Sequence, residues 1–168
     1  MGCPGSGKST LARELRAELG LPVHHLDALF WKPGWEETPT DEFADQVDEL
    51  ALREAWIIDG GYVRLDRNEL RFKRADITIL LRRSRLLCLF RVIHRAFKFR
   101  NQTRPDMGEA CPEKLEWALL SLIWNYEARN WPELLERVTR NKSPHLILRG
   151  NANVPGLIEQ LNQMSTAP

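Results

Sequence analysis

The sequence predicts an α/β fold in which a doubly wound parallel sheet carries helices on both faces. Strand and helix patterns alternate along the chain, which is typical of this fold class. Residues 77–81 form a near-continuous apolar run, as expected of a parallel strand covered on both sides. A glycine-rich loop at residues 2–10 leads directly into a helix, and such loops lie at the carboxyl edge of these sheets.

The individual elements follow from spacing and from local start and stop signals. A first helix is predicted over Ser9–Leu19, because leucines recur on one stripe and Gly20 ends it. A second begins near Thr40, where Thr38 and Pro39 supply a cap and a first-turn proline. Helical spacing predicts further helices over residues 86–99, 113–129 and 154–164, and one that begins at residue 132. Four strands are predicted, at residues 21–26, 56–58, 77–81 and 145–148.

Length and composition limit the class of protein. A chain of 168 residues suits one domain, residues 1–168, with its own core. The net charge of +1 gives no general reason for binding nucleic acid or a membrane. Three widely spaced cysteines, an odd number, favour a reducing compartment over a disulfide framework. The sequence shows neither a long apolar run nor a signal-peptide pattern, so we expect a cytoplasmic protein without a membrane partner.

The glycine-rich loop fits the phosphate-binding pattern G-x-x-x-x-G-K-[ST] at each fixed position. Glycines lack a Cβ, so successive backbone N–H groups can turn inward around a phosphate. Lys8 is expected to reach the β- and γ-phosphates of ATP, and the Ser9 hydroxyl to bind Mg²⁺. The predicted cofactor-binding residues are Gly2, Gly5, Ser6, Gly7, Lys8, Ser9 and Thr10.

Two of the predicted strands run into an aspartate. Asp59 stands where phosphate-loop proteins place a second carboxylate associated with Mg²⁺; a structural turn aspartate is the alternative. Gly60 and Gly61 follow it, whereas ATP-driven motors usually have a glutamate there that polarises water, and this favours phosphoryl transfer over hydrolysis. Asp27 is a candidate to orient an acceptor hydroxyl, to act as general base or to help hold Mg²⁺. Its alternative is a solvated acid at a strand end.

Basic residues dominate the segment from Arg82 to Arg104, which holds eight Lys or Arg side chains and no acid. Arg91, Arg95 and Lys98 share one helix face, opposite an apolar stripe. This face is predicted to close over the transferring phosphoryl group and stabilise its charge. Binding to nucleic acid phosphates and simple solvation are the alternatives. The polar loop at residues 101–112 that follows suits a mobile lid that excludes water.

Aromatic residues and histidines receive plainer interpretations. Trp117, Trp124 and Trp131 recur every seven residues, which is more typical of packing than of a base-stacking platform. The histidines show no ligand spacing, and this includes the adjacent pair at 24 and 25. Three aromatic residues can either line a pocket for a nucleobase or belong to the core: Trp31, Trp35 and Tyr62.

Several sequence blocks together resemble the bacterial DNA topology modulation proteins, a family of adenylate-kinase-like P-loop kinases within the P-loop NTPase superfamily. The resemblance covers almost the whole chain and rests on blocks at residues 2–12, 26–27, 30–35, 56–60, 75–76, 103–107 and 111–113, with Arg91 and Arg95. The resemblance implies a nucleoside- or nucleotide-kinase-like fold that binds ATP and Mg²⁺. The family name refers to an effect on DNA supercoiling, which does not require direct DNA binding.

Position by position, the resemblance assigns Lys8 and Ser9 to the phosphate loop, Asp59 to the second carboxylate, and Arg91 and Arg95 to the arginines of a lid. It also implies a lid-like insertion at about residues 98–113. Two departures from the family pattern stand out. Gly61 replaces a more frequent Asn, and residues 81–84 lack the acid that usually ends the fourth strand.

The resemblance also makes the region before the loop unusual. Only Met1 precedes Gly2, whereas a strand at the centre of the sheet feeds the loop in the adenylate-kinase-like topology. Without that strand, two neighbouring strands would keep unpaired backbone groups. We therefore expect a truncated first strand, with the true start upstream and some five to seven apolar residues before Gly2, an ordinary strand length.

Two functions follow from these observations. The first is a kinase that transfers the γ-phosphoryl group of ATP to a small nucleoside- or nucleotide-like acceptor, with Lys8, Asp27, Arg91 and Arg95 as its catalytic residues and with Ser9 and Asp59 at the metal. The second is a nucleotide-binding regulator associated with DNA topology that uses the basic face on DNA and has no turnover. The first is favoured. The sequence does not identify the acceptor or the oligomeric state.

Overall fold

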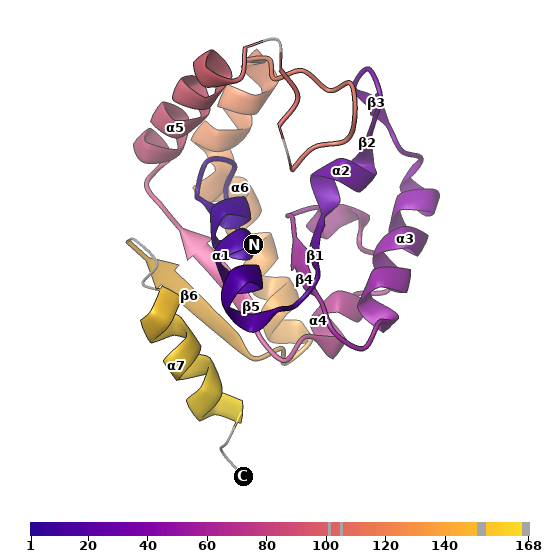
Figure 1. Ribbon diagram of the computed structural model, residues 1–168, viewed down its shortest axis with the longest axis vertical. Helices are drawn as coiled ribbons and strands as arrows, with labels where there is room; N and C mark the ends of the chain where they lie inside the picture. The colour runs from indigo at the N-terminus through magenta and orange to yellow at the C-terminus, as the bar shows by residue number, and fades with distance from the viewer. Residues whose placement is uncertain (101, 105, 151–153, 166–168) are drawn as a thin grey trace.

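The computed structural model describes residues 1–100, 102–104, 106–150 and 154–165 (Figure 1). Its helices are α1 (Lys8–Leu19), α2 (Leu26–Phe30), α3 (Thr40–Leu52), α4 (Leu70–Arg74), α5 (Arg85–Lys98), α6 (Trp117–Arg140) and α7 (Val154–Ser165), with a 3-10 turn at Val63–Leu65. Its strands are β1 (Val23–His25), β2 (Trp31–Lys32), β3 (Glu36–Glu37), β4 (Ile57–Asp59), β5 (Thr78–Arg82) and β6 (His145–Arg149).

The strands form three sheets of two strands each. β1 pairs with β4 and β5 with β6, both in parallel, while β2 and β3 form a short antiparallel hairpin. This mixture of helices and small parallel sheets is compatible with the predicted α/β class. A single doubly wound sheet is not seen, because in the described part of the chain no strand ladder joins β4 to β5.

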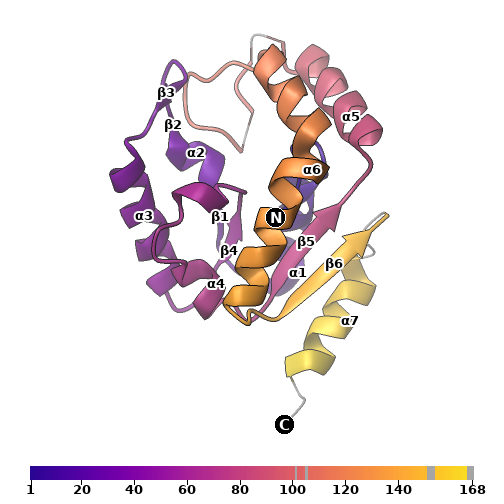
Figure 2. The same cartoon turned by 180° about the vertical axis from the view of Figure 1, so that it is seen from behind.

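Helices cover both faces of the β5–β6 pair. Leu81 packs with leucines of α1 and α7 on one side, whereas Leu80 packs with Leu134 and Val138 of α6 on the other. The two views agree with this: α1 lies in front of the strands in Figure 1, and α6 lies in front of them in Figure 2. The alternation follows from the two-residue period of a strand, and it makes β5 the centre of this half of the core.

A second core lies between α2, α3 and β4. Leu26 and Phe30 of the short helix α2 pack against the buried face of α3, which carries Phe43, Val47 and Leu50. Phe30 and Phe43 meet edge to face, with ring centroids 5.2 Å apart. This contact is a favourable geometry for aromatic pairs. The core fixes α2 beside the end of β1, and therefore fixes the position of Asp27.

Several predicted boundaries were wrong. The break predicted between two helices at residues 129–132 is absent from α6, which continues through Pro132. Trp131 and Leu134, on either side of the proline, are both buried, and their burial offsets the cost of about 3 kcal/mol for a proline inside a helix. The strand predicted at residues 21–26 ends at His25, and α2 and the β2–β3 hairpin follow it.

The first two residues of the chain lie beside β5. The amide of Leu81 donates to the carbonyl of Met1 at 2.8 Å, and Gly2 forms a parallel bridge with Leu81. The start of the phosphate loop is thus held at the carboxyl end of β5. The further apolar residues expected before Gly2 stay a prediction.

The apolar stripe of α5 is not part of the core. Leu86, Phe90 and Phe97 are exposed, and Ile93 is 37% exposed. The interpretation of the tryptophan stripe as packing holds for Trp131 alone, because Trp117 and Trp124 are also exposed. Spacing predicts correctly that these side chains share a face, but the described elements leave that face uncovered. None of the described helices is long and apolar enough to cross a membrane.

Candidate functional site

The phosphate loop begins beside β5, where Gly2 bridges to Leu81, and turns into α1. Gly7 takes the left-handed conformation (φ 98°) directly before the first residue of α1, and Gly5 has a φ of 78°. A Cβ added to Gly5 would lie 2.5 Å from the carbonyl oxygen of Cys88 in α5. Glycine is therefore required at Gly5 both by its backbone angle and by the close approach of α5.

A groove of about 590 Å³ runs along the loop. Its wall includes residues 5–10 of the loop, and most of the charged side chains that line it are cations: Lys8, Arg13, Arg83, Arg91, Arg95 and Arg104, against Glu14 and Asp106. The ammonium of Lys8 donates to the carbonyl of Cys3 at 3.0 Å, which holds it across the loop. The predicted cofactor-binding residues from Gly5 to Thr10, with Lys8 among them, thus line one concave surface.

α5 places Arg91 over the loop. One terminal nitrogen of Arg91 lies 3.4 Å from the carbonyl oxygen of Ser6, and it would lie 3.6 Å from a Cβ on Gly7. Arg83, which follows β5, lies on the same wall and donates to the carbonyl of Leu148 at 2.7 Å. Burial lowers the pKa of Arg83, and the neighbouring Arg91 charge lowers it further. The two guanidinium groups therefore form a concentrated positive charge beside the loop.

Arg95, one turn after Arg91, lies in a different environment. Its ε nitrogen donates to Glu113 at 2.8 Å, and Arg104 forms ion pairs with Glu113 at 2.6 Å and with Asp106 at 2.9 Å. Burial lowers the pKa of Arg95, and the charge of Arg104 lowers it further, while Glu113 raises it. Arg95 was predicted to face the transferring phosphoryl group; the structure places it in the groove but paired with a carboxylate.

These ion pairs tie the predicted lid to α5. The lid loop also bonds to the β2–β3 turn, through the indole of Trp35 to the carbonyl of Pro112 at 3.1 Å and through the amide of Gly34 to Ala110 at 3.1 Å. Asn101 and Pro105 of the predicted lid lie outside the described residues. Whether the segment moves as a lid stays a prediction.

Asp59 lies at the end of β4 and pairs with a histidine. Nδ1 of His25, the last residue of β1, is 2.9 Å from Oδ2 of Asp59. Burial raises the pKa of Asp59, but the hydrogen bond with His25 and the charge of Lys8 outweigh it, so that the pKa lies below its ordinary value. The same hydrogen bond raises the pKa of His25 more than burial lowers it. The two residues therefore form an ion pair at the edge of the phosphate loop.

The residues beside Lys8 fit a magnesium ion. The side chain of Ser9 lies close enough to the carboxylate of Asp59 to help lower its pKa, so the two predicted metal ligands lie together. Mg²⁺ in phosphate-transfer sites is usually held by one or two carboxylates plus substrate phosphates and waters, without a dedicated cage. The described ranges contain no cluster of three or more His, Cys, Asp or Glu side chains placed to hold a metal.

Asp27 lies on α2, two residues beyond the end of β1, and accepts a hydrogen bond at 2.8 Å from the hydroxyl of Tyr62. The tyrosine ring packs against Phe30 and Phe43, with centroids 4.8 and 5.1 Å away. Burial raises the pKa of Tyr62 far above its ordinary value, and the charge of Asp27 raises it further, so the hydroxyl remains a donor. Tyr62 therefore belongs to the core through its ring and to the site through its hydroxyl.

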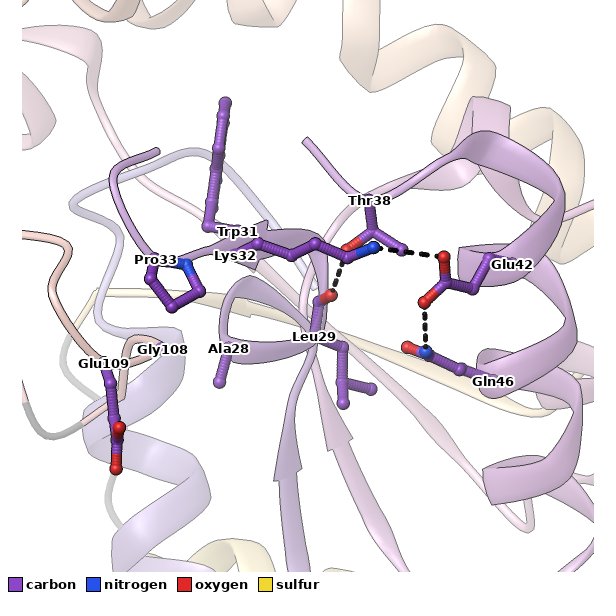
Figure 3. A pocket seen from close by; sticks show the side chains of 10 residues that line it. All are labelled: Ala28, Leu29, Trp31, Lys32, Pro33, Thr38, Glu42, Gln46, Gly108 and Glu109. Atoms are coloured by element: carbon purple, nitrogen blue, oxygen red, sulfur yellow. Dashed lines mark hydrogen bonds and ion pairs between the residues drawn. The ribbon is translucent and has the colours of Figure 1, made fainter. Parts of the chain in front are cut away.

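A second pocket, of about 380 Å³, lies beside α2 and the β2–β3 hairpin (Figure 3). It is lined by Ala28, Leu29, Trp31, Lys32, Pro33, Thr38, Glu42, Gln46, Gly108 and Glu109. Figure 3 shows Lys32 bonded to Glu42, and Glu42 to Gln46, along one wall. Of the candidate residues named from the sequence, Trp31 alone lines this pocket, and the polar groups of the pocket largely bond to one another.

Sequence reasoning missed two residues of the candidate site: His25, which pairs with Asp59, and Glu113, which pairs with two arginines. His25 was dismissed for lack of ligand spacing, yet it pairs directly with Asp59 in the β1–β4 register. The available signal was that both residues stand at the carboxyl ends of neighbouring strands. Glu113 follows Arg95 by eighteen residues, and no local pattern indicates that they meet.

Comparison with known proteins agrees with the kinase-like features of this site. A scan against protein-family models found no match. The chain is 29% identical over 147 residues to a protein of Thermococcus onnurineus named "Putative adenylate kinase", covering 88% of this chain and 77% of that protein. It is 28% identical over 153 residues to a Pyrococcus furiosus protein of the same name, covering 91% and 80%.

These two likenesses extend over most of both chains and support an adenylate-kinase-like family. The fold and the site agree with that class, because a phosphate loop and a cationic helix line one groove and a strand-end carboxylate, Asp59, lies close to Ser9 of the loop. The narrower resemblance to DNA topology modulation proteins is not confirmed by these relatives. It stays a prediction.

Proposed function

We propose that this protein is an ATP-dependent phosphotransferase that transfers a phosphoryl group to a nucleoside- or nucleotide-like acceptor. The observation that carries the proposal is the arrangement around the phosphate loop. Lys8 of α1 and Arg91 of α5 both reach backbone carbonyls of the loop, and Asp59 and Ser9 lie together at its end. Phosphoryl transfer needs positioning and charge stabilisation above all, and this arrangement supplies both. The names of the two archaeal relatives support the same class of activity.

In this proposal the loop amides and Lys8 bind the β- and γ-phosphates of ATP. Ser9 and Asp59 hold Mg²⁺, which supplies positive charge to the phosphate oxygens. Arg91 and Arg83 offset the negative charge that develops on the transferred group. Arg95 holds the segment after α5 in place through Glu113.

Asp27 is the proposed acceptor-binding residue. Its carboxylate accepts a hydrogen bond from Tyr62 and keeps further acceptor capacity for a hydroxyl of the substrate. Because the ring of Tyr62 is fixed by Phe30 and Phe43, the carboxylate is held in one orientation. The proposal includes the doubly wound sheet of a nucleotide kinase, supported by two parallel strand pairs and by helices on both faces of β5–β6.

The position of the cations supports a nucleotide over DNA as the phosphate that they bind. Of the basic residues between Arg82 and Arg104, four line the groove beside the loop, namely Arg83, Arg91, Arg95 and Arg104. An extended DNA backbone needs cations spread over an open face. A regulator that binds DNA through this segment is therefore the weaker proposal.

The acceptor is tested directly by incubating the protein with ATP and Mg²⁺ and with one candidate at a time, either a nucleoside or a nucleoside monophosphate. We expect ADP to form in an acceptor-dependent way with at least one candidate, together with the phosphorylated acceptor, and to stop when Mg²⁺ is chelated. ATP binding without transfer to any candidate, combined with salt-sensitive binding to DNA, would instead support the regulator.

A further inference from the structure

The helices α5 and α6 expose a large apolar surface on the side away from the phosphate loop. We call this surface the outer face and define it by Leu86, Phe90, Ile93, Phe97, Trp117 and Trp124. Each of these residues is between 37% and 83% exposed. Figures 1 and 2 show α5 at the edge of the molecule, alongside the first half of α6. Helix spacing and one direct contact join the six residues into a single surface.

The direct contact is a stack across the two helices. The guanidinium carbon of Arg85, at the start of α5, lies 4.1 Å from the ring centroid of Trp124 on α6. Trp117 precedes Trp124 by seven residues, so both tryptophans lie on the same side of α6. Leu86 follows Arg85 directly and begins the apolar stripe of α5. The tryptophans therefore extend the stripe rather than form a separate patch.

The size and composition of the outer face fit an interface between proteins. Its residues present roughly 700 Å² of mostly apolar surface, given their exposed fractions and roughly 150–250 Å² for a whole aromatic residue. The largest patch on an ordinary monomer is about 300–600 Å², and a standard interface takes about 800 Å² from each partner. Four of the six residues are aromatic and none is charged, as in the centre of protein interfaces.

The order of residues along α5 identifies the partner. The stripe has the spacing four, three, four, which is symmetric about its midpoint between Phe90 and Ile93. When two such helices pack antiparallel about a two-fold axis, Leu86 of each copy meets Phe97 of the other. Phe90 meets Ile93 in the same way. This spacing is also the repeat by which helices pack side by side in coiled coils.

We propose that the outer face binds a second copy of this chain, and that α5 packs antiparallel against α5 of that copy. The rim supports this partner, because it carries both signs of charge: Glu127 of α6 pairs with Arg82 at the end of β5, and Glu116 pairs with Lys114 just before α6. A self-complementary interface needs both signs of charge at its rim. An anionic membrane surface would favour a rim of cations alone. The proposal does not depend on the phosphotransfer activity.

Sedimentation velocity over a wide dilution series tests the proposal on the unmodified protein. We expect a species with about twice the 19.5 kDa mass of the chain, which dissociates on dilution. Phe90→Glu and Phe97→Glu, each of which places a charge in the interface, should weaken association by at least about tenfold. Both positions are exposed, so thermal unfolding of each variant should match that of the parent.

Leu52→Glu is the matched control, since Leu52 is an exposed leucine on α3 with 59% of its surface accessible. It should leave the dimer intact. A monomer at every concentration would overturn the proposal, and so would a dimer that tolerates both phenylalanine variants. A monomer that binds vesicles of phosphatidylcholine and phosphatidylserine would assign the face to membranes and overturn it as well.

Cross-linking tests the antiparallel register separately. With a short bismaleimide, Leu86→Cys mixed with Phe97→Cys should give a covalent dimer, whereas Leu86→Cys alone should give little. The three native cysteines are buried, which keeps the background low. Efficient cross-linking of Leu86→Cys to itself would contradict the antiparallel arrangement.

Discussion

On the phosphate-loop side of the groove, Lys8 and Arg91 donate hydrogen bonds to backbone carbonyls. On the opposite side, Arg95 of α5 and Arg104 of the segment between α5 and α6 form ion pairs with the buried carboxylate of Glu113. A carbonyl leaves the charge of a cation uncompensated, whereas a carboxylate neutralises it. The difference shows that Arg91 and Arg95, which lie one turn apart on the same helix, have separate roles. The charge of Arg91 stays available to a phosphate, whereas Arg95 stabilises the fold.

The largest expected effect separates Arg91 from Arg95 on α5. Arg91→Ala should lower the turnover number about 10²- to 10³-fold, because it removes a cation that stabilises the transferred group. Arg95→Ala should lower it less and should reduce the melting temperature instead, because it leaves Glu113 with one partner fewer. Steady-state kinetics and thermal unfolding of the two variants check this. Equal losses of turnover would break the comparison.

The next largest effect concerns Glu113, the carboxylate that pairs with the arginines on the opposite side of the groove. Glu113→Gln removes the charge between Arg95 and Arg104, two cations that would then repel each other while partly buried. Breaking a buried ion pair in this way costs about 3 kcal/mol, which for a chain of this length lowers the melting temperature by roughly 6–12 °C. Differential scanning calorimetry measures the shift. An unchanged melting temperature would mean that the network does not hold the segment.

A smaller effect is expected from the pair at the loop itself, His25 and Asp59. The folded-state pKa of His25 lies above its ordinary value of 6.5, so its contribution to stability is full below that pH and is lost as the pH rises through the folded pKa. The pKa of Asp59 lies below 3.8, so its contribution is present above that pH and is lost as the pH falls through the lower folded value. The pair should therefore stabilise the fold most between about pH 4 and 6.5.

His25→Gln isolates this contribution. The difference in free energy of unfolding between parent and variant should be about 1–2 kcal/mol near pH 5.5 and should decline at alkaline pH. Urea unfolding at several pH values measures it. A difference that grew with pH would contradict the ion pair.

The smallest effect is expected at the proposed acceptor site. Tyr62→Phe keeps the ring between Phe30 and Phe43 but removes the hydroxyl that donates to Asp27. The KM for the acceptor should rise a few-fold, equivalent to about 1 kcal/mol, while the KM for ATP stays the same. Kinetics at varied acceptor concentration test this, and an effect on ATP alone would remove Asp27 from the acceptor site.

Local patterns predicted the loop, the helix that follows it and the strand that ends at Asp59, because each depends on neighbouring residues. Features that depend on distant residues were missed. The continuation of α6 through Pro132 depends on the burial of Trp131 and Leu134 in a core that spacing cannot place. The pairing of His25 depends on strand register.

The charge and hydrophobic patterns of α5 show the same limit. They identified its two faces correctly, but they did not reveal that Glu113 neutralises one of two similar arginines. Nor did they reveal that the apolar face lies outside the core. A pattern shows which residues share a face, and only the fold shows what that face meets.

Lys8→Ala tests the central claim most directly, that the groove holds the phosphates of ATP for transfer. Lys98→Ala, which removes an exposed lysine of α5, is the matched control. With the acceptor that supports ADP formation, we predict that Lys8→Ala loses at least about 10²-fold in turnover while its melting temperature stays close to that of the parent. Lys98→Ala should remain active. Unchanged turnover in a folded Lys8→Ala protein would contradict the account.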